Sequence, residues 1–207
     1  MNGKSSHESM ILSYRNMFVV LSVTLLLLLP AGQSSPLTCK ELLQPLDQLD
    51  PHHVAGRWDL VAGSLSDPAL LEFFKERDSS SIYFSNATAT SNISYSTFVH
   101  IDGKCHDRTY NISLEVSTIV FDVRHQINLT LTMIHTPCAD CVVMRFDNES
   151  KKAERLWLFS RRREVETKEL EEFRAQVECL NMLPPAVMDP NKELCELGIR
   201  TEDNEQA

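Results

Sequence analysis

Hydrophobic and polar residues alternate along the chain from residue 56 to residue 163, and turn-forming residues interrupt the alternation about every ten positions. A period of two is typical of strands that bury one face, and closely spaced turns join such strands into an antiparallel sandwich or barrel. The pattern predicts eight strands, at residues 56–65, 80–86, 92–101, 105–115, 118–125, 126–135, 141–147 and 154–161. Eight such strands can close into a barrel wide enough for one small ligand.

The stretch CHDRTYNISLE, residues 105–115, shows how the two faces of a strand are assigned. Asn111 begins an Asn-Ile-Ser acceptor for N-linked glycosylation, so its side chain must face solvent if the acceptor is used. Alternation then places Arg108 on the opposite face, together with Tyr110 and Ile112. The strand therefore predicts a guanidinium inside a mainly apolar barrel.

One helix is predicted after the strands, within ETKELEEFRAQVECL, residues 166–180. Thr167 is the expected N-cap, and apolar residues follow at helical spacing. These apolar residues are Leu170, Phe173, Val177 and Leu180. Pro184 and Pro185 then interrupt the chain, and residues 186–189 are predicted to form a last short strand.

Residues 17–29, MFVVLSVTLLLLL, form an apolar run that follows Arg15 and precedes the small and polar residues PAGQSSP. This arrangement is typical of a secretory signal peptide, and the run is shorter than the about 20 residues of a membrane-spanning helix. A membrane anchor and a signal sequence that is retained uncleaved are the alternatives. We therefore expect a secreted, extracellular protein without a membrane span, made of an N-terminal extension with the signal peptide (1–35), one domain (36–197) and a disordered acidic tail (198–207).

The predicted mature chain is acidic. Without Lys4, Glu8 and Arg15, the 20 basic and 29 acidic residues of the sequence become 18 and 28, so the net charge is −10. The one basic cluster, SRRR at 160–163, is too short to form a continuous basic stripe, and we expect no nucleic-acid partner.

Five acceptor sequences for N-linked glycosylation occur, and together with the predicted signal peptide they indicate a secreted glycoprotein. The acceptor residues are Asn86, Asn92, Asn111, Asn128 and Asn148. Those on predicted strands fall on the polar face and the others fall in turns, so that no glycan has to enter the core.

Six cysteines in a secreted chain predict a disulfide framework, for which fifteen pairings are open. They are Cys39, Cys105, Cys138, Cys141, Cys179 and Cys195. The spacing of Cys138 and Cys141 also occurs in redox and zinc sites, but neither a βαβ unit nor two further ligands accompany it. We therefore predict a local structural disulfide at this pair, and no metal.

Two short motifs resemble those of the lipocalin family. VAGRWDLVAGS is similar to the first lipocalin motif, with Gly56 and Trp58, and LWLFSRRR is similar to the third motif, with Arg161 at the end of the eighth strand. In lipocalins this arginine packs over the tryptophan and closes the base of the barrel, a cation–π contact worth about 0.5–2 kcal/mol. The second motif is absent, because HTPCADCVVMRF stands in its place.

Within the family, residues 38–197 resemble the group of apolipoprotein M and α1-acid glycoprotein, which includes toxin- and organotin-binding plasma lipocalins. The segments TKELEEFRAQVECL and DPNKELCEL carry this resemblance. It implies an all-β fold, an eight-stranded antiparallel up-and-down barrel with one C-terminal α-helix packed outside. It also implies the disulfides Cys39–Cys179 and Cys105–Cys195, which leave Cys138–Cys141 to cross-link a hairpin turn.

The resemblance implies reversible carriage of a small hydrophobic or amphiphilic ligand, such as a lipid, retinoid, steroid or drug-like molecule, as in lipid transport by apolipoprotein M. Inward-facing positions of the predicted strands then give the candidate ligand-binding residues, each of which could equally fill the core. They are Phe84, Tyr95, Val99, Arg108, Tyr110, Ile112, Phe121, Leu129, Leu131, Met144, Phe146, Arg155 and Trp157.

Arg108 and Arg155 are the candidates for a clamp on an anionic head group, because a guanidinium binds phosphate or carboxylate in a bidentate manner. Apolipoprotein M presents arginines to a lysophospholipid phosphate at positions similar to these, whereas a third such position carries Gln126 here. In the alternative, both arginines lie at a wet barrel mouth or pair with acidic residues such as Glu115. The α1-acid glycoprotein branch prefers basic and neutral drugs, so the charge preference of the ligand stays open.

Two other classes of function are alternatives to a ligand carrier. The first is an interaction protein that associates with lipoprotein particles or modulates immunity, and whose pocket is incidental to that function. An enzyme is disfavoured, because all six cysteines have plausible partners and because His52, His53 and His106 have no carboxylate or nucleophile at a telling spacing. We expect a monomer that needs no cofactor.

Overall fold

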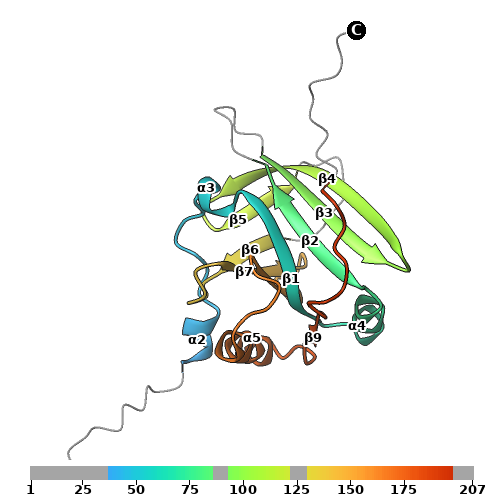
Figure 1. Ribbon diagram of the computed structural model, residues 1–207. Coiled ribbons are helices and arrows are strands. Elements are labelled where there is room, and N and C mark those ends of the chain that lie inside the picture. The colour runs from blue at the N-terminus through green and yellow to red at the C-terminus, as the bar shows by residue number, and fades with distance from the viewer. Residues whose placement is uncertain (1–36, 86–92, 122–129, 198–207) are drawn as a thin grey trace, which may run out of the picture. The chain divides into compact units, whose positions relative to one another are not determined.

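The computed structural model describes residues 37–85, 93–121 and 130–197, all within one compact unit that begins at Leu37. Eight antiparallel strands form an up-and-down barrel (Figure 1), which confirms the predicted fold class. The strands are β1 (Gly56–Leu65), β2 (Ser79–Phe84), β3 (Ile93–Ile101), β4 (Lys104–Glu115), β5 (Thr118–Phe121), β6 (Thr130–Ile134), β7 (Cys141–Asp147) and β8 (Ala153–Ser160). Because β1 pairs with both β2 and β8, the sheet closes on itself, and β9 (Ala186–Val187) pairs with β1 from outside.

The β3–β4 hairpin illustrates how local sequence sets this topology. Asp102 and Gly103 both have positive φ angles, 51° and 67°, as a tight two-residue hairpin turn requires. The resulting register pairs Tyr95 with Tyr110 and puts their side chains on the same face of the sheet. Asn111 is exposed and Ile112 is buried, in agreement with the predicted alternation.

Helix α5 (Thr167–Cys179) packs on the outside of the barrel, where Phe173 and Val177 join a second apolar cluster with Val143 and Leu158. The prediction that Thr167 is the N-cap is wrong by one residue. Glu166 occupies that position, because the carboxylate of Glu169 accepts the backbone N–H of Glu166 at 2.7 Å and the helix begins immediately afterwards.

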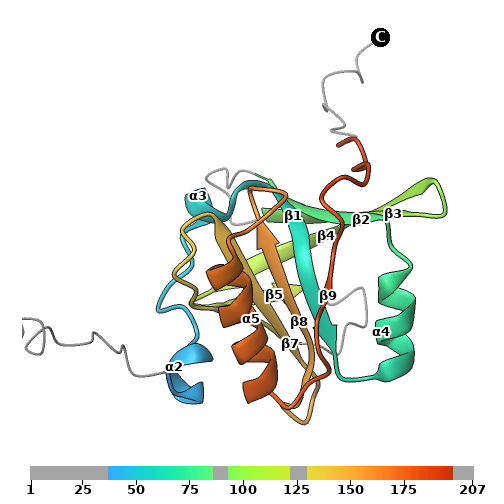
Figure 2. The same ribbon diagram turned by 60° about the horizontal axis from the view of Figure 1, so that its bottom comes forward.

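Three further short helices were not predicted: α2 (Cys39–Leu42), α3 (Pro51–Val54) and α4 (Pro68–Lys75). Helix α4 starts with Asp67 as N-cap, whose Oδ1 accepts the N–H groups of Ala69 and Leu70 at 2.7 and 3.1 Å. It buries Leu71 and Phe74. Figure 2 shows α4 and α5 on either side of β9.

Three disulfides stabilise the unit, and they join the pairs that the sequence and the resemblance implied. Cys39–Cys179 links α2 to the end of α5, Cys105–Cys195 links β4 to the C-terminal segment, and Cys138–Cys141 lies in the β6–β7 turn. Cys39 and Cys179 are 140 residues apart, and a loop of that length is stabilised by about 4–5 kcal/mol in the chain-entropy description of disulfides.

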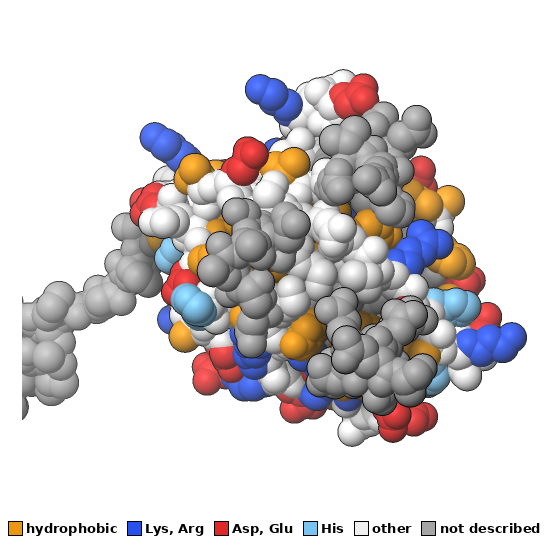
Figure 3. Space-filling view, turned by 90° about the horizontal axis from the view of Figure 1, so that it is seen from above, with side chains coloured by type: hydrophobic (Ala, Val, Ile, Leu, Met, Phe, Trp, Pro, Cys, Tyr) orange, Lys and Arg blue, Asp and Glu red, His pale blue; other side chains and the backbone are white. Residues whose placement is uncertain are grey.

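Acidic and basic side chains are interspersed on the face of the unit shown in Figure 3, where the described residues form no continuous basic patch. Within residues 37–85, 93–121 and 130–197, none of the helices has the length and apolar character needed to cross a membrane.

Candidate functional site

One end of the barrel is closed by Trp58 and Arg161. The Arg161 guanidinium lies 3.7 Å from the centre of the Trp58 ring and donates hydrogen bonds to the carbonyls of His53, Ala55 and Arg57 at 3.0, 2.6 and 2.8 Å. Partial burial lowers the pKa of Arg161 below its ordinary value. These contacts tie Arg161 to the segment that leads into β1.

Gly56 makes this closure sterically feasible. Its φ angle is +93°, and a Cβ at this position would lie 2.9 Å from Nη1 of Arg161. The indole N–H of the buried Trp58 donates to the carbonyl of Val54 at 2.8 Å, so the ring is held from both sides. All three residues of the expected closing motif therefore lie together.

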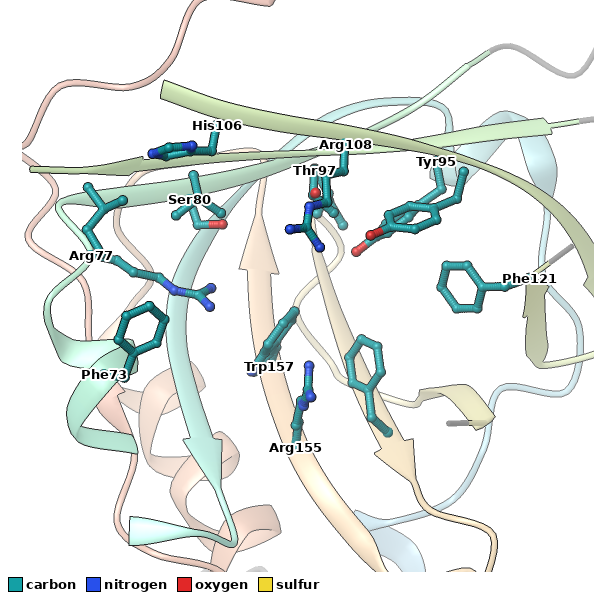
Figure 4. A pocket seen from close by; sticks show the side chains of 15 residues that line it. Phe73, Arg77, Ser80, Tyr95, Thr97, His106, Arg108, Phe121, Arg155 and Trp157 are labelled. Carbon is teal, nitrogen blue, oxygen red and sulfur yellow. The ribbon is translucent and has the colours of Figure 1, made fainter. Parts of the chain in front are cut away.

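The other half of the barrel encloses a cavity of about 520 Å³ (Figure 4). Arg155 and Arg161 lie near opposite ends of β8, so the cavity opens away from the closed end. Strands β2, β3, β4, β5, β7 and β8 and the α4 segment supply its wall. The lining residues are Phe73, Arg77, Ser80, Ile82, Tyr95, Thr97, Val99, Ile101, His106, Arg108, Tyr110, Phe121, Phe146, Arg155 and Trp157.

Aromatic rings form much of the wall. Tyr95, Tyr110 and Phe121 meet with ring centroids 5.7 to 6.2 Å apart, and Phe146 lies 4.9 Å from Trp157. Burial raises the pKa of the Tyr95 hydroxyl above its ordinary value, so that it stays neutral at physiological pH. Such a wall suits the apolar part of a ligand.

The structure brings most of the predicted ligand-binding residues to this cavity. Eight line it: Tyr95, Val99, Arg108, Tyr110, Phe121, Phe146, Arg155 and Trp157. Four others are buried in the core instead of on the wall: Phe84, Ile112, Leu131 and Met144. Alternation predicted that these four side chains point inward, but it could not predict whether they lie at the level of the cavity or of the packed core. Leu129 lies outside the described residues.

Sequence reasoning missed the contribution of α4. Phe73 lies on that helix and Arg77 two residues beyond its end, and the segment had no predicted helix at all. Thr97 and His106 also line the cavity and were not among the predicted lining residues. An Asp-Pro start followed by apolar residues, as in DPALLEFF, was the available signal for the helix.

Three guanidiniums approach the cavity from different sides: Arg77 follows α4, Arg108 lies on β4 and Arg155 on β8 (Figure 4). Among the described residues, no ion pair with a carboxylate holds any of them. Nε of Arg155 is buried without a hydrogen-bond partner, and Nε1 of Trp157 is in the same condition. The cavity is therefore apolar in its walls and cationic in its charge.

The guanidinium of Arg77 is affected by its surroundings in the cavity wall. Burial lowers the pKa of Arg77 below its ordinary value, and the charge of Arg155 lowers it further. Glu115, considered as a partner for Arg108, is exposed at the far end of β4, about 23 Å along the strand at 3.3 Å per residue. An anion placed among the arginines would offset the repulsion between the positive charges of Arg77 and Arg155.

The described glycosylation acceptors lie outside the cavity. Asn111 is exposed on β4. Asn148 lies in the β7–β8 turn, where its Oδ1 accepts two backbone N–H groups at 3.0 Å and its Nδ2 donates to Glu154 at 3.1 Å. Asn86, Asn92 and Asn128 lie outside the described residues.

A cluster outside the cavity has the composition of a metal site. Cys138, Asp140, Cys141 and Glu169 bring their potential ligand atoms within 4.8 Å of one another. Both sulfurs, however, form a disulfide, and the guanidinium of Arg162 pairs with both carboxylates. The arginine thus occupies the place of a cation in this cluster.

A closed eight-stranded antiparallel barrel, plugged at one end by tryptophan and arginine and hollow at the other, defines the lipocalin class. Among solved structures, the siderocalin Ex-FABP, described as functioning through dual ligand specificities, superposes with a TM-score of 0.55 at 17% sequence identity. The match covers 66% of this chain and 93% of that chain, and it supports the fold. A comparison with curated proteins gave no match.

The family assignment is more specific than the fold. The model of the ApoM domain matches residues 43–199, which is more than half of the 207-residue chain. The chain therefore belongs to the ApoM domain family and is an apolipoprotein M-type lipocalin.

Proposed function

We propose that this protein is a secreted glycoprotein that carries a small amphiphilic ligand with an anionic head group inside its barrel. The observation that supports this most is the set of three guanidiniums, Arg77, Arg108 and Arg155, in a mainly apolar cavity without a carboxylate partner among the described residues. The apolar run at 17–29, the five acceptor sequences and the three disulfides support secretion and glycosylation.

Physical chemistry favours such a ligand. Burying apolar surface of an alkyl chain against the aromatic wall contributes about 25 cal/mol per Å². A buried guanidinium without a partner is costly, and a carboxylate or phosphate offsets that cost by two parallel hydrogen bonds. A neutral ligand would gain only the free energy of burying its apolar surface and would leave the guanidiniums without an anionic partner. We therefore expect the cavity to prefer acids over neutral molecules of the same shape.

A second candidate, association with lipoprotein particles, is supported by two exposed apolar residues of α4, of which Phe73 also lines the cavity. Leu70 and Phe73 are 48% and 55% exposed. An uncleaved N-terminal apolar segment would favour this candidate. N-terminal sequencing of the secreted protein tests it, because a sequence that starts after residue 29 lacks the segment that would favour it.

The test of the proposed function is a double substitution, Arg108→Ala with Arg155→Ala, assayed with oleate and with oleyl alcohol. Oleate affinity should fall at least tenfold, about 1.4 kcal/mol, whereas the affinity for the alcohol should hardly change. Arg174→Ala, on the exposed face of α5, is the matched control for loss of charge. Equal losses for both probes would mean that the arginines support the barrel and not a head group.

A further inference from the structure

Arg77 reaches the cavity by a route different from that of the strand arginines. It follows α4, and its Cζ lies 5.0 Å from the ring centroid of Phe74 and 6.0 Å from that of Trp157. The two rings are themselves stacked, with centroids 6.3 Å apart and planes inclined by 28°. A guanidinium over aromatic faces is attracted by their quadrupoles, so this stack holds Arg77 in one place.

The position of Phe74 depends in turn on a glycine of the barrel. Phe74 is 1% exposed, and it packs over Gly63 of β1, which is the register partner of Trp157 on β8. A Cβ at Gly63 would lie 2.5 Å from Cζ of Phe74 and 3.1 Å from both Cε atoms. No side chain fits there unless the ring moves. Gly63 therefore sets where α4 lies against the barrel.

The charge of Arg77 is not balanced within the described residues. Burial lowers the pKa of Arg77, and the positive charge of Arg155 lowers it further, so both disfavour the charged form of its guanidinium. In Figure 4 the guanidiniums of Arg77, Arg108 and Arg155 point into the same space from three directions. An anion in that space would contact groups from α4, β4 and β8 together.

We propose that Arg77 is a specificity-determining residue of this cavity, a third guanidinium for the anionic head group, and that Phe74 seated over Gly63 positions it. The inference rests on the proposed function, because it assigns one more group to the same head-group site. Arg77 contacts the ligand directly, whereas Phe74 and Gly63 are positioning residues. Removing the charge and displacing the helix should therefore have the same effect on selectivity.

The experiment measures the ratio of the affinities for oleate and oleyl alcohol in the full secreted chain. Arg77→Gln should lower this ratio about fivefold, and Arg77→Lys should lower it less, because the charge remains while the planar guanidinium is lost. Gly63→Ala should lower the ratio as much as Arg77→Gln does. Combining Gly63→Ala with Arg77→Gln should cause no further loss, since both act through one guanidinium. Arg174→Gln is the control and should leave the ratio unchanged.

The outcomes separate this inference from the function on which it rests. If the Arg108→Ala and Arg155→Ala double variant loses selectivity and Arg77→Gln does not, the third guanidinium is wrong and the proposed function stands. If none of the variants loses selectivity, the proposed function itself fails. Additive losses from Gly63→Ala and Arg77→Gln would overturn the positioning role. Should Gly63→Ala not fold, Phe74→Leu, which removes the aromatic support, takes its place with the same expectations.

Discussion

The two ends of the barrel use arginine in opposite ways. At the closed end, Arg161 covers the Trp58 ring and donates to three backbone carbonyls, so that its hydrogen-bonding groups serve the fold. At the open end, Arg155 keeps a buried Nε without a partner, and no carboxylate among the described residues pairs with it. A satisfied arginine indicates structure, and an unsatisfied one indicates a site built for something that binds.

The largest effect is expected from the two tryptophans of the chain, one at each end. Trp58→Ala should lower the free energy of unfolding by about 3–5 kcal/mol, because the ring is fully enclosed. Trp157→Ala should cost less than half as much, since one side of that ring already faces the cavity. Urea denaturation compares the two, and equal losses would remove the distinction between a packed end and a hollow end.

A smaller effect is expected from the arginines themselves. Arg161→Ala should lower the free energy of unfolding by about 1.5–3 kcal/mol, the range for hydrogen bonds to a charged group. Arg155→Ala should leave it unchanged or raise it slightly, because an unpaired, partly buried charge is removed. The same denaturation experiment checks this. A large loss from Arg155→Ala would show that the open-end arginine also serves the fold.

The smallest effect on the site is expected from Asn111, which shares β4 with Arg108 but faces outward. Asn111→Gln should lower the mass of the secreted protein by one glycan and leave the affinity for oleate nearly unchanged. Mass spectrometry and a binding titration check both parts. A marked loss of affinity from the substitution itself would mean that the faces of β4 are reversed.

Alternation along the strands predicted the barrel and the inward direction of Arg108, because side-chain direction in a strand follows from position alone. Alternation could not predict how far along the barrel each inward side chain lies. Phe84 and Met144 point inward yet are buried in the core, and their level along the barrel depends on strand tilt and stagger, which involve the whole sheet.

Helix α4 shows a second limit. It is eight residues long, too short to be stable by itself, and it is fixed by the contact of Phe74 with Gly63 of β1. That contact is tertiary, so the place of the helix against the barrel, unlike its Asp-Pro start, is not contained in any local pattern. Arg77, which follows the helix, was missed for the same reason.

The proposed function requires that the arginines of the open end, which have no carboxylate partner among the described residues, bind the anionic head group of an amphiphile. Native mass spectrometry of the protein from secreting cells, with organic extraction of what co-purifies, tests it most directly. We expect an acidic amphiphile bound to the wild-type protein and lost from the double variant Arg108→Ala with Arg155→Ala. A neutral or basic molecule, retained equally by both proteins, would contradict it.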